Sequence, residues 1–235
     1  MCVAVAILAV VVVAACTVTP ALTFPMSPPA SASVTVTPSA RPSAAPRPLG
    51  PAAAALAAMP VKGRAPKTGY ARAQFGPAWA DTDRDGCDQR NQVLGRDLTA
   101  VTKRGRCVVV SGVLRDPYTG ATVPFLRGTL TSDDVQIDHV VALSNAWQTG
   151  AQALDVYHRE MIATDPLNLL AVDGPTNQSK GDGDAATWLP PAKGYRCAYV
   201  ARQVAVKTRY KLWVTAAERD AIGRVLADCP TQGLP

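Results

Sequence analysis

Short apolar runs separated by polar turns dominate the chain after residue 100, and their composition predicts strands. Residues 107–114 are mostly β-branched and apolar, which favours a strand. Residues 121–125 return after a turn, and Pro124, which cannot donate to a ladder, indicates an edge strand. The apolar run at residues 135–137 then leads into an Asp-His pair. We therefore expect a small antiparallel sheet whose last strand carries this pair.

Apolar positions at helical spacing predict helices on both sides of these strands. Asp88 is a suitable N-cap for a helix whose apolar positions continue through Val101. Thr215 and Glu218 have the pattern of a capping box at the start of the final helix. Further helices are expected at residues 140–149, 151–161, 176–181, 195–210 and 215–227. Strands and helices together predict a small α+β fold with flanking helices.

Residues 1–16 have the pattern of an export signal. Residues 3–15 are apolar and uncharged, and this run is too short to span a bilayer, which takes about 20 residues. Small residues precede Cys16, as in a bacterial lipobox, where this cysteine would become the lipidated first residue and a membrane anchor. Ordinary cleavage that removes Cys16 is the alternative. Either way, we expect a protein that is secreted or anchored to the outer face of the bacterial cell membrane.

Residues 17–67 are rich in Pro, Ala, Ser and Thr and predict a disordered tether, with at most a transient helix at residues 52–59. Residues 68–235 would then form the one folded domain. Because several basic residues belong to the tether and no acid precedes Asp81, the domain carries 19 basic and 18 acidic residues. Any nucleic acid must therefore bind through a local patch of charge.

Four cysteines remain in the predicted domain, an even number in an exported chain, which indicates two disulfides. Three pairings are possible. We favour Cys87 with Cys107 and Cys197 with Cys229, because each pair brackets one local unit. The chain has no Cys-x-x-Cys spacing, which argues against a metal-thiolate site.

The acidic stretch at residues 81–86 begins like a calcium loop of the EF-hand type. Such a loop ends in a bidentate Glu at its twelfth position, where this chain has Gln92, so we interpret the stretch as a turn before a helix. Arg90 on that helix could contact phosphate or pair with an acid such as Asp83, and we favour the pairing. His158, in a charged helical stretch, is expected to be a surface residue without a chemical role.

The pair Asp138-His139 is the strongest candidate for chemistry. Adjacent side chains of a strand point to opposite faces, so the two can share a site only where the strand ends, at a cleft. Asn168 lies in an apolar run that would form the second strand of a hairpin with this one. Asn177 and Lys180 are three residues apart, hence on one face of a short helix.

This ordered set resembles the HNH (ββα-metal, or His-Me finger) endonucleases, and the flanking motifs resemble a secreted bacterial family of HNH-nuclease-like proteins. The resemblance covers roughly residues 78–229. Its motifs are Asp-x-Asp-x-x-x-Cys-x-x-Arg from Asp81, Asp116-Pro117-Tyr118-Thr119-Gly120, Asp138-His139, Trp188-Leu189-Pro190-Pro191 and Tyr195-Arg196-Cys197-Ala198-Tyr199. The fold that it implies contains a ββα-metal finger stapled by disulfides.

The resemblance also implies roles for the site residues. His139 would be the general base, Asp138 and Asn177 would bind a divalent metal, Asn168 would orient the His139 ring, and Lys180 would contact phosphate. So few oxygen ligands favour Mg²⁺, with Mn²⁺ as an alternative.

One position departs from the family pattern, because Asn177 stands where many HNH proteins have His. An amide oxygen is the weaker ligand, and Asp182 or Asp184 could compensate.

Two functional hypotheses follow. The first is an exported, monomeric, metal-dependent endonuclease that cuts DNA or RNA with little sequence preference. The second is a surface-tethered lipoprotein that binds an extracellular polymer through an inactive HNH-like fold, its Asp-His pair being a hydrogen-bonded structural element.

Overall fold

The structure is a computed structural model in which residues 50–235 are described. The predictions for the signal at residues 1–16, for lipidation of Cys16 and for a tether over residues 17–49 lie outside the described residues. Within residues 50–235, every helix is too short or too polar to cross a membrane. The described part is a mixed α+β fold, as the sequence predicts.

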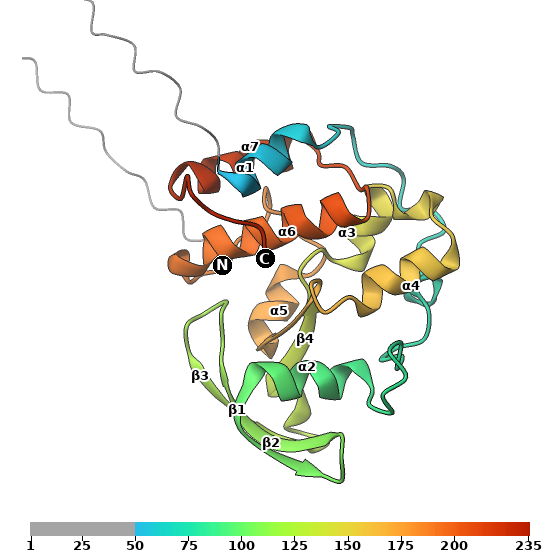
Figure 1. Ribbon diagram of the computed structural model, residues 1–235, viewed down its shortest axis with the longest axis vertical. Helices are drawn as coiled ribbons and strands as arrows, with labels where there is room; N and C mark the ends of the chain where they lie inside the picture. Colours follow the sequence, from blue (N-terminus) through green and yellow to red (C-terminus); the bar gives the residue numbers. More distant parts are fainter. Residues whose placement is uncertain (1–49) are drawn as a thin grey trace, which may run out of the picture. The chain divides into compact units, whose positions relative to one another are not determined.

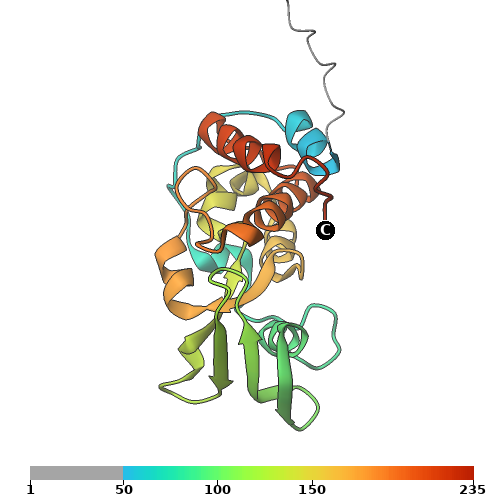
Figure 2. The same cartoon turned by 90° about the vertical axis from the view of Figure 1, so that its left-hand side faces the viewer.

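Three antiparallel strands in the order β1-β2-β3 form the larger sheet. They are β1 (Leu98–Arg104), β2 (Val108–Arg115) and β3 (Thr122–Leu126). The edge position predicted for the strand with Pro124 is confirmed. The helix α2 (Gln89–Asp97), capped by the side chain of Asp88, packs beside β2. The sheet and α2 lie at one end of the described domain (Figures 1 and 2).

A separate hairpin carries the Asp-His pair, which corrects the expectation of a single sheet. The strands β4 (Val135–His139) and β5 (Leu169–Asp173) pair antiparallel and form a second, two-stranded sheet. The short helix α5 (Gly174–Lys180) follows β5 directly and contacts both strands. The unit β4-β5-α5 is therefore a ββα finger, which we call the finger from here on.

The helix α2 ends at Asp97, earlier than the periodicity through Val101 predicts. The residues after it are rich in β-branched side chains and pair with β2, with Thr99 opposite Val113. Arg90 on α2 is also placed differently from the prediction. Its guanidinium donates to the carbonyl oxygens of Ser132 and Val135 at 3.0 and 3.1 Å and so ties α2 to the start of β4.

Helices form the other end of the domain, over the finger (Figure 1). The helix α6 contacts both α1 and α7. The helices of this part are α1 (Pro51–Ala58), α3 (Leu143–Gln148), α4 (Val156–Thr164), α6 (Arg196–Arg209) and α7 (Ala216–Ala227). Single helical turns lie at η1 (Arg72–Phe75), η2 (Ser132–Asp134), η3 (Ala151–Ala153) and η4 (Lys193–Tyr195). The capping box predicted for α7 is present.

The boundary predicted at residue 67 is wrong, because residues 50–67 belong to the fold. Ala52 and Leu56 of α1, and Met59 directly after it, are buried in the same apolar cluster as residues of α6 and α7. Beyond α1, the Lys62 amide donates to the Val214 carbonyl at 3.1 Å. The domain thus includes residues 50–67, and this segment adds basic residues to it.

Both predicted disulfides are present. Cys87 is bonded to Cys107 and joins the start of α2 to the start of β2, and Cys197 is bonded to Cys229 and joins α6 to the end of α7. Each disulfide links elements that are close in sequence, and neither includes a residue of the finger.

Candidate active site

The last two residues of β4 face one cavity of about 540 Å³. Asp138 and His139 lie opposite Leu170 and Leu169 in the hairpin, and the pairing stops after His139. Asn177 on α5 also lines this cavity, which we call the reaction cavity. The sequence prediction that the strand ends at a cleft agrees with this geometry.

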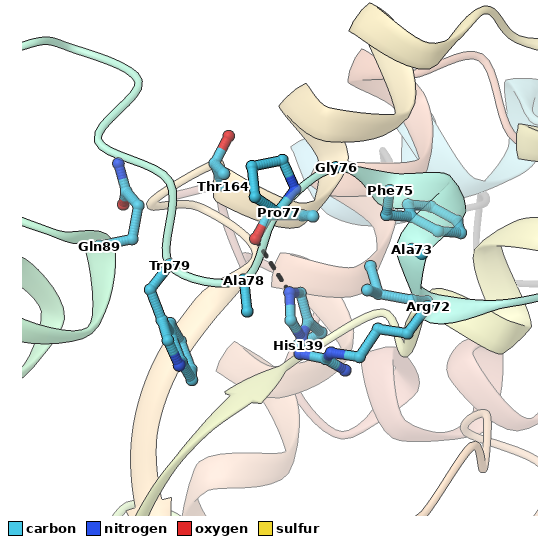
Figure 3. Close-up of a pocket in the computed structure, with 12 residues that line it drawn as sticks. Arg72, Ala73, Phe75, Gly76, Pro77, Ala78, Trp79, Gln89, His139 and Thr164 are labelled. Carbon is cyan, nitrogen blue, oxygen red and sulfur yellow. Dashed lines mark hydrogen bonds between the residues drawn. The ribbon is translucent and has the colours of Figure 1, made fainter.

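The His139 ring is held by one backbone carbonyl. Its Nε2 lies 2.9 Å from the carbonyl oxygen of Ala163 at the end of α4 (Figure 3). Because a carbonyl oxygen can only accept, Nε2 carries the hydrogen of the neutral ring and Nδ1 is left with its lone pair. Among the described residues Nδ1 has no hydrogen-bond partner.

The electrostatic surroundings keep this imidazole neutral. Burial lowers the pKa of His139 to about 4, and the nearby guanidinium of Arg72 adds to the effect. The bond to Ala163 and the charge of Asp138 act in the opposite direction and are outweighed. At neutral pH, His139 is therefore a neutral base whose free nitrogen has a defined position.

Asn168 does not contact the His139 ring, so its predicted role is corrected. Its Oδ1 accepts from the Val141 amide at 2.8 Å, and its Nδ2 donates to the carbonyl oxygens of Val141 and Ile162 at 3.3 and 3.0 Å. The side chain is fully buried. Since Ile162 precedes Ala163, Asn168 holds the end of α4 and the loop after His139, and acts on the base only through this backbone.

Asp138 is fixed from two sides inside the finger. The hydroxyl of Tyr118 donates to its Oδ2, and the ammonium group of Lys180 donates to its Oδ1 at 2.8 Å. Burial, with the charge of Asp138 second, raises the pKa of Tyr118 well above its usual value, so the phenol stays a donor. Asp116 links this arrangement to β5, since its Oδ1 accepts from the Asp173 amide at 3.1 Å.

Lys180 is buried, which differs from the expected contact with phosphate. Besides Asp138, its ammonium group donates to the His139 carbonyl at 2.9 Å, and its side chain has no exposed surface. A direct phosphate contact would require this group to leave both partners. In the structure, Lys180 instead positions the ends of the Asp-His pair.

Asn177 presents an oxygen ligand to the reaction cavity. Its Nδ2 donates to Gln136 Oε1 at 2.9 Å, and among the described residues its Oδ1 accepts no hydrogen bond. Each oxygen of Asp138 keeps a further lone pair. One carboxylate and one amide oxygen are the donor types of a hard cation that retains most of its waters, as Mg²⁺ does, and such a cation would share the Asp138 carboxylate with the Lys180 ammonium group. Of the two acids proposed to compensate, Asp182 lines the cavity and Asp184 is paired with Arg64.

A cluster of three carboxylates that could hold a metal ion lies outside the finger. Within residues 50–235, the one group of at least three His, Cys, Asp or Glu ligands is Asp81, Asp83 and Asp85, all exposed. Their oxygens accept bonds from the Asp85, Gly86 and Cys87 amides, in keeping with the predicted turn. The finger site does not depend on them.

Arg72 is an exposed cation beside the candidate base. It lies on η1 and lines the reaction cavity. Figure 3 shows its side chain beside the His139 ring. Among the described residues, its side chain forms neither an ion pair nor a hydrogen bond. Lys67 lines the same cavity and pairs with Asp182 across 3.0 Å. The two cations form the local patch that a near-neutral domain requires for an anionic ligand.

Comparison with known proteins places the chain in a family. The family described as GmrSD restriction endonucleases, C-terminal domain, matches residues 88–225, more than half of the chain. The chain belongs to this family. It is a family of nuclease domains, which agrees with the resemblance to HNH enzymes.

One relative of this GmrSD C-terminal domain is an "Uncharacterized secreted protein" of Arthroderma benhamiae. It is 40% identical over 176 residues, which cover 74% of this chain and 82% of the relative. Because that relative is fungal, the predicted restriction of the family to bacteria is not confirmed. No solved structure matches the chain.

The region matched to the GmrSD C-terminal domain contains all five site residues predicted from sequence, but not Arg72. Arg72 lies in a stretch without a motif, so the sequence contains no signal for it. Tyr118 could be singled out from sequence, because it is the centre of the Asp116–Gly120 motif. Only the fold shows that its hydroxyl donates a hydrogen bond to Asp138.

Proposed function

We propose that this GmrSD-family domain is an exported, metal-dependent HNH-type endonuclease that hydrolyses phosphodiester bonds with little sequence preference. One observation carries the proposal. The bond from His139 Nε2 to the Ala163 carbonyl leaves Nδ1 of a neutral imidazole as the free acceptor at a cavity shared with Asp138 and Asn177. A general base needs this combination of position and protonation state.

His139 would accept the proton of the attacking water. The water oxygen bonds to phosphorus as its proton passes to Nδ1, the bond from phosphorus to the leaving oxygen breaks, and that oxygen takes a proton from solvent. The Ala163 carbonyl would keep the ring from turning, and Asn168 holds that part of the backbone through the Ile162 carbonyl. The protein groups thus supply orientation and proton transfer.

Asp138 and Asn177 would hold a divalent cation, which when bound supplies Lewis-acid stabilisation of the leaving oxygen. Tyr118 and Lys180 fix the two oxygens of Asp138, and Gln136 fixes the amide of Asn177. The ligands are therefore oriented before any cation arrives. Such pre-orientation by neighbouring hydrogen bonds is typical of metal sites.

Arg72 would bind the substrate phosphate in place of Lys180. It is exposed and free of protein partners among the described residues, so it can pair with an anion without breaking an existing bond. Inclusion of residues 50–67 brings the domain to 22 basic and 18 acidic residues, still a small excess. Contacts to the phosphates of a nucleic acid carry no sequence information, which supports low sequence specificity.

Export is supported by two observations. The Arthroderma benhamiae relative is named a secreted protein. The chain itself has two disulfides, which persist mainly in oxidising compartments. We propose that the domain acts outside the cell, as a monomer, either free or held by a lipid on Cys16.

The test is incubation of the purified chain with plasmid DNA and with RNA, in Mg²⁺ or Mn²⁺ and in a chelator. We expect nicking or degradation with a divalent ion, none in chelator, and none from His139→Ala. Absence of cleavage by the wild-type protein in every ion would instead favour the polymer-binding alternative with an inactive finger.

A further inference from the structure

A second cavity of about 310 Å³ opens on the other side of the candidate base. It shares His139 and Arg72 with the reaction cavity, and in Figure 3 Trp79 and Arg72 lie on either side of the His139 ring. We call it the side cavity. Its volume falls at the lower end of the range for small-ligand pockets. Of the residues that line it, the mechanism above uses His139, Arg72 and the carbonyl of Ala163.

Gln89, at the start of α2, forms a fixed part of the side-cavity wall. It is 3% exposed, and its Nε2 donates to the Thr82 hydroxyl at 3.2 Å. Its Oε1 is inaccessible in the structure, so it does not face the cavity.

An aromatic ring is fixed at the same cavity. Trp79 is partly exposed and has a φ of 60°, a conformation that is strained for a bulky residue. The guanidinium of Arg90 lies 5.8 Å from its ring centroid and is itself anchored to the carbonyls of Ser132 and Val135. A strained, pre-positioned indole beside a candidate active site is expected to serve binding.

We propose that the side cavity receives one unpaired nucleobase, that of a nucleotide next to the cleaved phosphodiester. This inference rests on the proposed nuclease function. Trp79 would stack on the base. Because Arg72 and His139 line both cavities, a phosphate at Arg72 places the neighbouring base within reach of Trp79.

The substrate class follows from this arrangement. A base can enter an enclosed cavity only when it has left the stack and the pair of a duplex. Single strands, loops and bulges already offer such bases, whereas duplex DNA must first be unpaired. We therefore expect the enzyme to prefer single-stranded nucleic acid, with the sequence tolerance that stacking on an aromatic ring brings.

The first test measures binding without catalysis. Fluorescence anisotropy in chelator compares four short labelled oligonucleotides of one length: a single strand, a duplex, a duplex with one unpaired nucleotide, and the same duplex with that nucleotide made abasic. We expect tight binding to the first and third and weak binding to the others. Equal affinity for all four, or no measurable binding to the single strand, would overturn the proposal.

The second test uses variants. Trp79→Ala should weaken single-strand binding by about tenfold, the loss typical of one base–aromatic contact, while Trp79→Phe should retain most of it. Trp213→Ala is the matched control, because Trp213 also lies beneath a cation, Lys62 at 5.2 Å, but lines neither cavity. Equal losses in Trp79→Ala and Trp213→Ala, with both variants folded, would contradict the proposal.

A third measurement separates this inference from the proposed function. Plasmid cleavage reports separately on the proposed nuclease function: cleavage without any dependence on unpaired bases would refute the side cavity alone.

Discussion

Lys180 and Asp138 form a buried ion pair whose ammonium group also binds the carbonyl of His139. One cation therefore joins α5 to the last two residues of β4, and both side chains are almost completely inaccessible to solvent. This explains why a lysine at this position of the finger need not face the substrate. It also makes the finger depend on a single charge.

Replacing this lysine should destabilise the protein far more than replacing a surface lysine. Lys180→Met leaves the Asp138 carboxylate buried without its cation, which typically costs about 3–5 kcal/mol. Lys67→Met is the matched control, because it breaks an ion pair whose side chains are about half exposed and should cost less than about 1 kcal/mol. Urea unfolding in chelator measures both. Similar losses in the two variants would refute the structural role assigned to Lys180.

The buried imidazole should make the stability depend on pH. The pKa of His139 is about 4 in the folded protein and about 6.5 when unfolded. Between these pH values, His139 is protonated in the unfolded chain and neutral in the folded protein. Stability should therefore be complete above about pH 6.5 and fall towards pH 4, by about 3 kcal/mol in total.

Unfolding free energies measured across this pH range in chelator test the effect. His139→Asn should flatten this part of the profile, whereas His158→Asn, which alters an exposed histidine, should keep the wild-type slope. A wild-type slope in His139→Asn would mean that other groups cause the pH dependence.

The disulfides should contribute stability without affecting the site. They close loops of 20 and 32 residues, each worth about 3–4 kcal/mol in the chain-entropy model. The double variant Cys87→Ser/Cys107→Ser should lower the melting temperature and leave the half-saturating metal concentration unchanged, since neither bond lies in the finger. Free thiols at all four positions in protein recovered from outside the cell would contradict the pairing.

The N-terminal segment should be required for a stable domain. A chain of residues 68–235 lacks α1 and exposes the surface on which Leu56 and Met59 pack, and each such side chain contributes about 1.5–3 kcal/mol when buried. We expect it to melt well below a chain of residues 50–235. Equal melting temperatures would show that α1 is dispensable and that the domain boundary lies at residue 68.

Local sequence signals predict much of this fold. The Asp88 cap, the capping box at Thr215 and the hairpin around Pro124 each depend on residues close together in the chain, and all three are confirmed. The elements of the finger are predicted for the same reason, because β5 and α5 are contiguous in sequence.

Contacts between residues far apart in the sequence could not be predicted. Arg90 bonds to carbonyls 42 and 45 residues away instead of a nearby acid, and Tyr118 meets Asp138 across 20 residues. The alanine-rich composition of α1 is typical of a tether, and only the presence of α6 and α7 as a packing surface makes it part of the core. Metal binding and the site roles stay predictions that require measurement.

The most direct test of the account is the dependence of the cleavage rate on Mg²⁺ concentration, measured in single turnovers for three proteins. The wild-type rate should rise with Mg²⁺ and saturate. Asn177→Ala, which removes one oxygen ligand, should need more Mg²⁺ to reach half its maximum, and His139→Ala should be slower by about 10²–10⁴ at every Mg²⁺ concentration, the usual contribution of a general base. Cleavage by His139→Ala at the wild-type rate would contradict the assignment of His139 as the base.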